Sequence, residues 1–578
     1  MDSSVTSNLR PLKFPALAAD TVHTAANIRA LAGLLLVNLV MYAVSAYYVN
    51  VFYTHNLPHF DSIGPLTKMY EFINLARGRG AWAAWVFARQ YDSVSWVQSA
   101  YAILLSPLLP RTPSAMMGLN FACLFAAQAA LFDLGRKFGA SRLQAFGFGL
   151  LPLMPALLHG HYGTYQDMRR DASFLCLLLV AYCLSLTYLH KPAPGRGILL
   201  GVVAGLTLLS RGNALPYLAI ALLPAIVWAA ARYVVGRKWR ELLFVAATPL
   251  IPCALLVASY YRQSVSSLLF KYLYNTPDLG TTRMVSLAHF GPSPAVLLLG
   301  EPGRVFALKL ALLLIGLPAL VLLGLQGREL TWQPRRAFAG DRRWLAIGGA
   351  VALVGTLALV TLVVGVSPIA GYYPSYPVLI SLFSLLAALS LAVSFRDGRL
   401  PARNKRLLAV AVALVFTFAN SIDSLRLSTY PRQTANVRTA RELVPLLRAL
   451  APGRKVTWVW DGNLNYWVVN YYLSQAGEPP LQFFYPVSLD RLPSPALGET
   501  VESRAAEIEE SLRSADVLVL SDTPGAYTGI IGPGFFDTYG YLIVPDLLAD
   551  PRFEQVYDFE SDGYHFVILQ RIEPSNGG

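Results

Sequence analysis

The stretch GILLGVVAGLTLLSRGNALPYLAIALLPAIVWAAARYVVGRKWR, residues 197–240, indicates the fold class of this 578-residue chain most clearly. It contains two apolar runs, residues 197–210 and 214–231, separated only by Arg211-Gly212-Asn213 and followed by a basic linker. Uniformly apolar runs of about 20 residues are typical of membrane spans, whereas helices of soluble proteins are apolar on one face only. We therefore expect two membrane-spanning helices joined by a tight turn.

Similar apolar runs recur along residues 1–424, and every second linker between them is basic. The expected spans are roughly 27–50, 114–134, 143–158, 172–189, 197–210, 214–231, 242–260, 303–325, 344–366, 372–395 and 407–424. The basic linkers lie at 136–142, 191–196, 232–240, 328–343 and 396–406. Lys and Arg resist translocation, so these linkers and the N-terminus are predicted to be cytoplasmic, and about 11 spans send the C-terminus outward. The chain is thus predicted to be a polytopic α-helical protein of the cell (inner) membrane.

The composition supports a membrane protein, because 55% of the residues are hydrophobic, 14% are charged and the mean hydropathy is +0.46. The net charge of +13 is unevenly divided: residues 1–424 carry 35 Lys and Arg against 15 Asp and Glu, and the remainder carries 12 against 19. The basic residues belong mainly to the predicted cytoplasmic linkers, so no nucleic acid is needed to explain them. All four cysteines lie in apolar stretches, which argues against a disulfide framework or a thiolate metal site.

The sequence divides into a membrane domain, residues 1–424, and an extracytoplasmic soluble domain, residues 425–578. Three outward loops, residues 51–112, 159–171 and 261–303, are large enough to hold a site. The apolar segment 96–110 in the first loop is predicted to be re-entrant or to lie on the surface, because a span there would place every later basic linker outside. In the soluble domain we expect strands at 455–460 and 516–520, a helix at 502–514 and two strands within 553–569, which together make a small α/β domain.

Asp61 is the first candidate for chemistry, in the stretch His55-Asn-Leu-Pro-His59-Phe60-Asp61 after the first span. A carboxylate at the mouth of a helical bundle can serve as a general base toward a hydroxyl. Asp before an apolar-periodic run is also ordinary helix capping, which the spacing alone favours.

Asp171 immediately precedes the apolar run 172–179 and follows Arg169 and Arg170. It can be a helix cap, with the two arginines reaching to lipid headgroups. Arginines beside aspartates on the outward side also break the charge rule locally, which an anionic ligand or an acid-base network would explain.

Arg211 is the sharpest exception to the charge rule, since it stands alone between two apolar runs on the predicted outward side. It is either a side chain that reaches to the membrane surface from a tight turn or a fixed cation for a phosphate. The loop after Tyr261 offers further cations and tyrosines, including Lys271, Tyr274 and Arg283, which fit either a lipid-phosphate headgroup or an interfacial belt. The outward histidines, His59 among them, are expected to have structural or hydrogen-bonding roles.

Several segments, taken in order, resemble the GT-C glycosyltransferases, especially the bacterial branch related to protein O-mannosyltransferases and lipid A aminoarabinose transferases. The segments are Asp61 in the first loop, 102–110, 112–120 leading into a span that ends at 135–139, 171–175, 204–216 and Gly371-Tyr-Tyr-Pro-Ser-Tyr-Pro377. The resemblance covers most of the membrane domain.

The resemblance implies transfer of a sugar, with inversion, from a polyprenyl-phosphate donor to an acceptor hydroxyl of a glycan, lipid or protein on the extracytoplasmic face. Asp61 would be the catalytic base and Asp171 would assist it. The implied donor phosphate-binding residues are Arg169, Arg170, Arg211, Lys271, Tyr274 and Arg283, and the implied acceptor-pocket residues are His59, Tyr372 and Tyr373. Ser62 stands where the family commonly has an acidic residue, so no divalent metal or other cofactor is indicated.

Two other functions use many spans and buried charges. One is a transporter or flippase of lipids or glycans, although no inverted repeat or matching pair of broken helices is evident in the sequence. The other is a non-catalytic assembly protein whose outward domain docks a partner.

Overall fold

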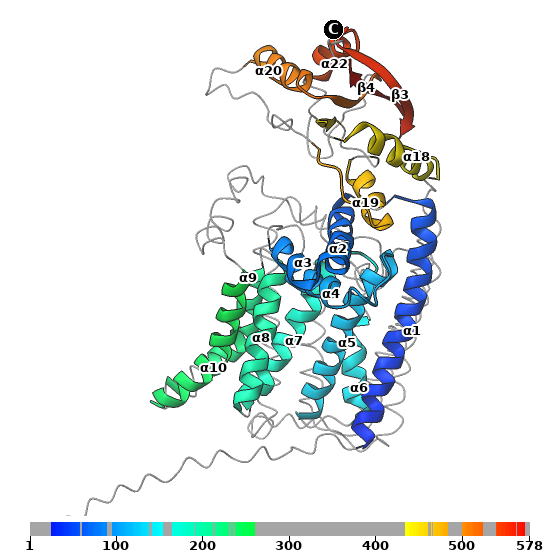
Figure 1. Ribbon diagram of the computed structural model, residues 1–578. Coiled ribbons are helices and arrows are strands. Elements are labelled where there is room, and N and C mark those ends of the chain that lie inside the picture. Colours follow the sequence, from blue (N-terminus) through cyan, green and yellow to red (C-terminus); the bar gives the residue numbers. More distant parts are fainter. Residues whose placement is uncertain are drawn as a thin grey trace, which may run out of the picture.

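The computed structural model describes residues 25–57, 60–89, 95–137, 142–153, 165–190, 192–211, 214–229, 233–234, 237–260, 434–452, 454–459, 464, 466–483, 500–523, 539–561 and 563–572. Within these ranges, a bundle of long helices is topped at one end by short helices and a four-stranded sheet (Figure 1).

The bundle is built from the predicted spans of the first half of the chain. Its helices are α1 (Ala25–His55), α5 (Pro113–Lys137), α6 (Arg142–Leu150) continued by η1 (Leu151–Leu153), α7 (Asp171–His190), α8 (Pro194–Ser210), α9 (Ala214–Ala229) and α10 (Trp239–Tyr260). Among the described residues, four helical segments are long and apolar enough to cross a membrane: Asn27–His55, Pro113–Lys137, Asp171–Leu189 and Trp239–Ser259. The four predicted spans from 303 onward lie outside the described residues, so the count of eleven stays a prediction.

Close packing of α8 on α10 depends on glycines spaced four residues apart. A Cβ on Gly201 would lie 2.1 Å from the carbonyl oxygen of Pro249, and one on Gly197 would lie 2.5 Å from the Thr248 side chain. Small residues at this spacing let two helix backbones approach closely, which is how helices commonly associate in lipid. The glycine face of α8 therefore packs directly against α10.

Three short helices lie at the end of the bundle that faces the C-terminal part (Figure 1). They are α2 (Phe60–Arg79), α3 (Ala81–Ala88) and α4 (Trp96–Leu104). Nine residues of α-helix extend only about 14 Å, less than half of the hydrocarbon core of a bilayer. The prediction that segment 96–110 does not span is thus confirmed by α4 and the turn after it.

The C-terminal unit is a mixed sheet covered by helices. Its elements are α18 (Thr434–Leu450), β1 (Val456–Trp458), α19 (Tyr466–Ala476), α20 (Val501–Arg513), β2 (Val517–Ser521), α22 (Gly540–Leu548), β3 (Phe553–Ser561) and β4 (Tyr564–Arg571). The strand order is β1-β2-β4-β3, with β1 parallel to β2 and the other pairs antiparallel. The predicted strands and the predicted helix at 502–514 are confirmed.

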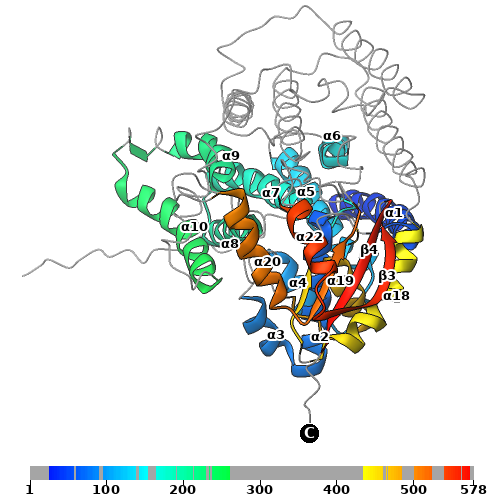
Figure 2. The same ribbon diagram turned by 90° about the horizontal axis from the view of Figure 1, so that it is seen from above.

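Strand β2 is fully buried because helices cover both faces of the sheet (Figure 2). Val517 and Val519 pack in the core that includes residues of α18 and α19, whereas Leu518 and Leu520 pack in a second core with residues of α20 and α22. Side chains alternate between the faces of a strand, so a strand buried on both faces needs a continuous apolar run. The sequence Val-Leu-Val-Leu meets that requirement.

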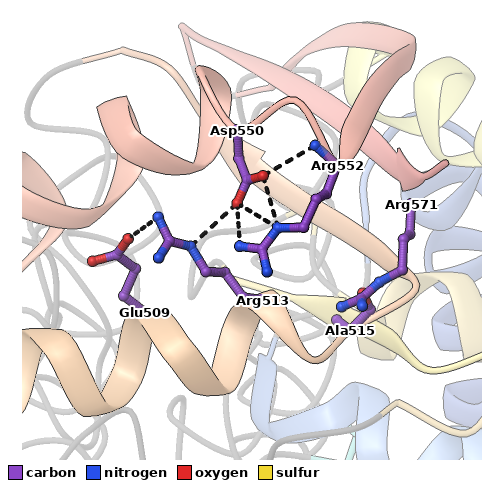
Figure 3. A network of polar contacts seen from close by, with 6 residues as sticks. All are labelled: Glu509, Arg513, Ala515, Asp550, Arg552 and Arg571. Atoms are coloured by element: carbon purple, nitrogen blue, oxygen red, sulfur yellow. Dashed lines mark hydrogen bonds and ion pairs between the residues drawn. The ribbon is translucent and has the colours of Figure 1, made fainter. Parts of the chain in front are cut away.

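A polar network joins α20 to the chain that follows α22 (Figure 3). The Asp550 carboxylate accepts hydrogen bonds from the backbone N of Arg552 at 3.0 Å and from its Nε at 2.9 Å, and lies 3.2 Å from Nε of Arg513. Arg513 in turn contacts Glu509 at 2.5 Å. The hydrogen bonds from Arg552 lower the pKa of Asp550 to about 2. The network therefore requires an ionised Asp550.

Candidate functional site

Helix α2 carries Asp61, the predicted base, in its first turn. The helix begins at Phe60, so Asp61 lies one residue inside it, where a carboxylate is stabilised by the N-terminal amide groups. The side chain of Asp61 lies outside what the structure describes, as do all atoms of His59. The assignment of Asp61 as the base stays a prediction.

Asp171 and Arg211 form an ion pair between the start of α7 and the end of α8. Asp171 is the first residue of α7, and Arg211, in extended conformation, ends α8. Nη1 of Arg211 donates to Oδ1 of Asp171, and the two side chains are only 13% and 7% exposed. The interpretation of Arg211 as a side chain reaching to the membrane surface is therefore wrong. Two residues selected separately in the sequence belong to one buried pair.

The segment before Asp171 is held by side chains from α4 and α5. Nδ2 of Asn120 donates to the carbonyl oxygens of Tyr165 at 3.2 Å and of Asp167 at 2.7 Å. Nε2 of Gln98 donates to the carbonyl oxygen of Met168 at 2.7 Å. Because these donors satisfy backbone groups of a buried, non-helical segment, they fix its path.

Arg169 is buried beside Asp167, with Nε 3.3 Å from Oδ2. It is 4% exposed, so the interpretation of Arg169 as a headgroup anchor is also wrong, whereas Arg170 is half-buried. Two carboxylates and two guanidinium groups thus lie within one small region at the end of the bundle. We call Asp167, Arg169, Asp171 and Arg211 the charged cluster.

The guanidinium groups of the charged cluster could bind an anion in surroundings from which most water is excluded. A guanidinium has five N–H donors in a planar fork, so one group can contact a carboxylate and a phosphate oxygen together. Low local dielectric strengthens such contacts. Buried charges that are already paired also need little rearrangement when charge develops nearby.

The other predicted site residues lie outside the described residues: Lys271, Tyr274, Arg283, Tyr372 and Tyr373. In the described ranges, no group of three or more His, Cys, Asp and Glu side chains is arranged to hold a metal ion. Gln98 and Asn120 are functional-site neighbours that were not predicted from the sequence. Each is an amide side chain in an apolar stretch, a pattern that indicates a buried hydrogen-bond partner.

Glu71 is a further buried acid on α2, 6% exposed, and both of its oxygens accept from Nζ of Lys68, at 3.0 and 2.8 Å. Burial raises the pKa of Glu71, while the ammonium of Lys68 opposes that rise. Lys68 and Glu71 lie one turn apart on the same helix face, so the pair is local to α2.

Comparison with known proteins found no matching family model and no matching curated protein. Among solved structures, the chain is similar to the oligosaccharyltransferase of Archaeoglobus fulgidus in its apo form, with 14% identity, 84% of this chain and 69% of that chain covered, and a TM-score of 0.45. The complex of that enzyme with Zn and sulfate matches with 13% identity, 92% and 72% coverage and a TM-score of 0.45.

The archaeal oligosaccharyltransferase AglB of the same organism, in complex with an inhibitory peptide and a dolichol-phosphate, matches with 13% identity, 93% and 75% coverage and a TM-score of 0.38. TM-scores of this size mark a loose likeness of chain path, and they do not define the activity of this chain.

Proposed function

We propose that this chain is an integral membrane glycosyltransferase of the GT-C type. It would move a sugar from a polyprenyl-phosphate donor to an acceptor hydroxyl, with inversion, at the membrane face that bears the C-terminal unit. The observation that carries the proposal is the buried pair of Asp171 and Arg211 within the charged cluster, at the same end of the bundle as α2.

The proposed chemistry needs a cation for the leaving group and a base for the acceptor. The acceptor oxygen forms a bond to the anomeric carbon as the bond from that carbon to the phosphate oxygen breaks, and the hydroxyl proton passes to Asp61. Arg211, with Arg169 and Arg170, would stabilise the charge that grows on the departing polyprenyl phosphate. Asp171 would orient Arg211. Lys271, Tyr274 and Arg283 would extend the phosphate site, and His59, Tyr372 and Tyr373 would line the acceptor pocket.

The position of the buried charges favours this proposal over a transporter. Among the described residues of the helical part, the buried charged side chains are Glu71, Asp167, Arg169 and Asp171. Glu71 lies in α2, Asp171 begins α7, and Asp167 and Arg169 lie in the segment just before α7, so all four lie near one end of the bundle. Transporters typically bind substrate near the bilayer midplane and move rigid halves around that site. A charged cluster tied to α4 and α5 at the end of the bundle is a fixed site.

The orientation and the domain division belong to the same proposal. The helix ends that flank the basic linkers, namely the C-terminal ends of α5 and α7 and the N-terminal ends of α8 and α10, lie at the end of the bundle opposite the C-terminal unit. With these linkers cytoplasmic, residues 425–578 and the charged cluster are extracytoplasmic. The protein would then reside in the inner membrane with a cytoplasmic N-terminus.

The test compares Asp61→Asn with Asp133→Asn in protein reconstituted with a panel of polyprenyl-phosphate hexoses and pentoses and a cell-envelope fraction as acceptor. Asp133 pairs with Lys137 at the opposite end of the bundle, so it is a matched carboxylate outside the proposed site. Release of polyprenyl phosphate should fall by about 10²- to 10⁴-fold in Asp61→Asn, the usual contribution of a general base, and stay unchanged in Asp133→Asn. Undiminished release in Asp61→Asn removes Asp61 as base, and no release by wild-type protein from any donor rejects the enzyme.

A further inference from the structure

Helix α19 of the C-terminal unit packs along α2, the helix that holds Asp61. Three contacts define the register: Gly64 with Trp467, whose ring lies 4.0 Å from the Cβ position, Tyr70 with Tyr471, whose ring centroids are 5.8 Å apart, and Asn74 with Ser474, joined by a 2.9 Å hydrogen bond. The residue numbers rise together, so the two helices run parallel, over about three turns of α2 and about two turns of α19. The first contact lies one turn from Asp61.

Arg111, which lies just before α5, fixes the C-terminal end of the contact between α2 and α19. Nη1 of Arg111 donates to Oδ1 of Asn74 at 2.8 Å, and Nδ2 of Asn74 donates to the carbonyl oxygen of Ser474. Nε2 of Gln475 donates to the carbonyl oxygen of Arg111 at 3.5 Å. One amide on α2 is therefore shared between the bundle and the C-terminal unit.

Gly477, which follows α19, is required for this arrangement. Its φ is +94°, a conformation that side-chain-bearing residues rarely adopt. A Cβ at this position would lie 2.1 Å from Nη1 of Arg111, so only glycine leaves room for the guanidinium. We call Asn74, Arg111 and Gly477 the latch.

The rest of the contact between α2 and α19 excludes water. The side chains of Tyr70 and Tyr471 are 0% and 2% exposed, and burial raises the pKa of both phenols. The first turn of α2 lies about 20 Å from Asn74, and the contacts with Tyr471 and Trp467 lie between them on either side of Pro65, so a tilt of the packed helix pair at Asn74 would displace that turn.

We infer that the C-terminal unit sets the position of the catalytic helix: the latch and the parallel packing of α19 hold α2, and with it Asp61, in the geometry that the reaction needs. Asn74, Arg111 and Gly477 are positioning residues. The inference rests on the proposed role of Asp61. It predicts that disturbing the latch lowers kcat and leaves donor binding intact, because the charged cluster that would hold the donor phosphate lies on other elements.

The first test uses Gly477→Ala with Gly563→Ala as the matched control. Gly563 has a similar φ of +81° in the turn between β3 and β4, but a Cβ there would meet nothing within 4 Å. Alanine should have a similar conformational cost at both positions, because both have positive φ, and only the methyl group of Gly477→Ala clashes with Arg111. With the polyprenyl-phosphate sugar panel, kcat should fall by about 10- to 100-fold in Gly477→Ala, with donor KM changed less than about threefold, since misplacing a catalytic group by 1 Å can cost about 100-fold. Equal kcat in the two variants overturns the inference.

The second test adds Arg111→Ala and the double variant Arg111→Ala/Gly477→Ala. Once Arg111 is shortened, the extra methyl group at 477 has room, so the double variant should lose no more kcat than Arg111→Ala alone. Multiplicative losses would show that the two residues act independently and would also overturn the inference.

Hydrogen exchange of the full-length protein separates this inference from the proposed function. Peptides from α2 should exchange faster in Gly477→Ala than in Gly563→Ala, whether or not the donor panel contains the substrate. If wild-type protein releases no polyprenyl phosphate, the proposed function fails, and α2 exchange alone decides the latch. Identical α2 exchange in the two variants rejects the latch itself.

Discussion

Removing Arg211 alone should destabilise the protein far more than removing a surface arginine. The Asp171 carboxylate is 7% exposed and has the Arg211 guanidinium as its ion-pair partner, so Arg211→Met leaves a buried charge without that partner. Breaking a buried pair in this way costs about 3–5 kcal/mol of unfolding free energy. Asp171→Asn should cost a similar amount, because it leaves a buried guanidinium. The double variant removes both charges and should lie within about 1–2 kcal/mol of wild type.

The assay is reversible unfolding in mixed detergent micelles for wild type, both single variants and the double variant. The four free energies form a double-mutant cycle, whose interaction energy should reach at least about 4 kcal/mol, because each single variant loses at least about 3 kcal/mol and the double variant at most about 2 kcal/mol. Single losses below about 1 kcal/mol that simply add would refute the reasoning, since such values are typical of solvated pairs.

The same four proteins separate a structural role from a functional one. If the pair only supports the fold, the double variant regains both stability and release of polyprenyl phosphate. If Arg211 also contacts the donor phosphate, as proposed, the double variant is stable but inactive. Stability and turnover that recover together would remove Arg211 from the donor site.

Three further outcomes are expected. Asp550 has a folded-state pKa of about 2, below its ordinary value of 3.8, so its contribution to stability is present above pH 4 and is lost as the pH falls toward 2. Pepsin should therefore cleave the C-terminal unit of the wild-type protein faster as the pH falls over this range. Cleavage of Asp550→Asn should depend less on pH. Asn120→Ala leaves the carbonyl groups of Tyr165 and Asp167 without this donor and should lower the stability of their segment by about 1–3 kcal/mol. Hydrogen exchange of residues 165–170 should become faster, and an unchanged rate would show that Asn120 does not hold the segment. A membrane-impermeant maleimide applied to intact cells should label Leu108→Cys and spare Arg237→Cys, and the reverse pattern would invert the proposed orientation.

The predicted helices and strands agree closely with the structure wherever it is described. The seven predicted spans up to residue 260 each correspond to a helix of the bundle, and the segment at 96–110 does not cross it. The boundaries differ most at α1, which continues to His55, and at α6, which changes to a 3₁₀ turn at Leu151. These elements were predictable because each depends on the hydrophobicity and length of one continuous stretch.

The candidate site was only partly predictable. Asp171 and Arg211 stood out because charges are costly beside apolar spans, yet each had a structural alternative that the sequence could not reject. Arg169 had two sequence-based interpretations, a headgroup anchor and a donor-phosphate ligand; the first is wrong, because Arg169 forms an ion pair with Asp167 in a segment that α4 and α5 hold in place. Burial depends on neighbours that lie far away in the chain.

The order of apolar helices, the alternation of basic linkers with linkers poor in Lys and Arg, and the small α/β unit at the end can all be predicted from the sequence, because each depends on the composition of one continuous stretch. The pairing of Arg211 with Asp171, 40 residues earlier, and the hydrogen bond that Asn74 donates to the carbonyl oxygen of Ser474, 400 residues later, are evident in the three-dimensional structure alone. Such partners are chosen by how helices pack in three dimensions, and no periodicity along the chain encodes that choice.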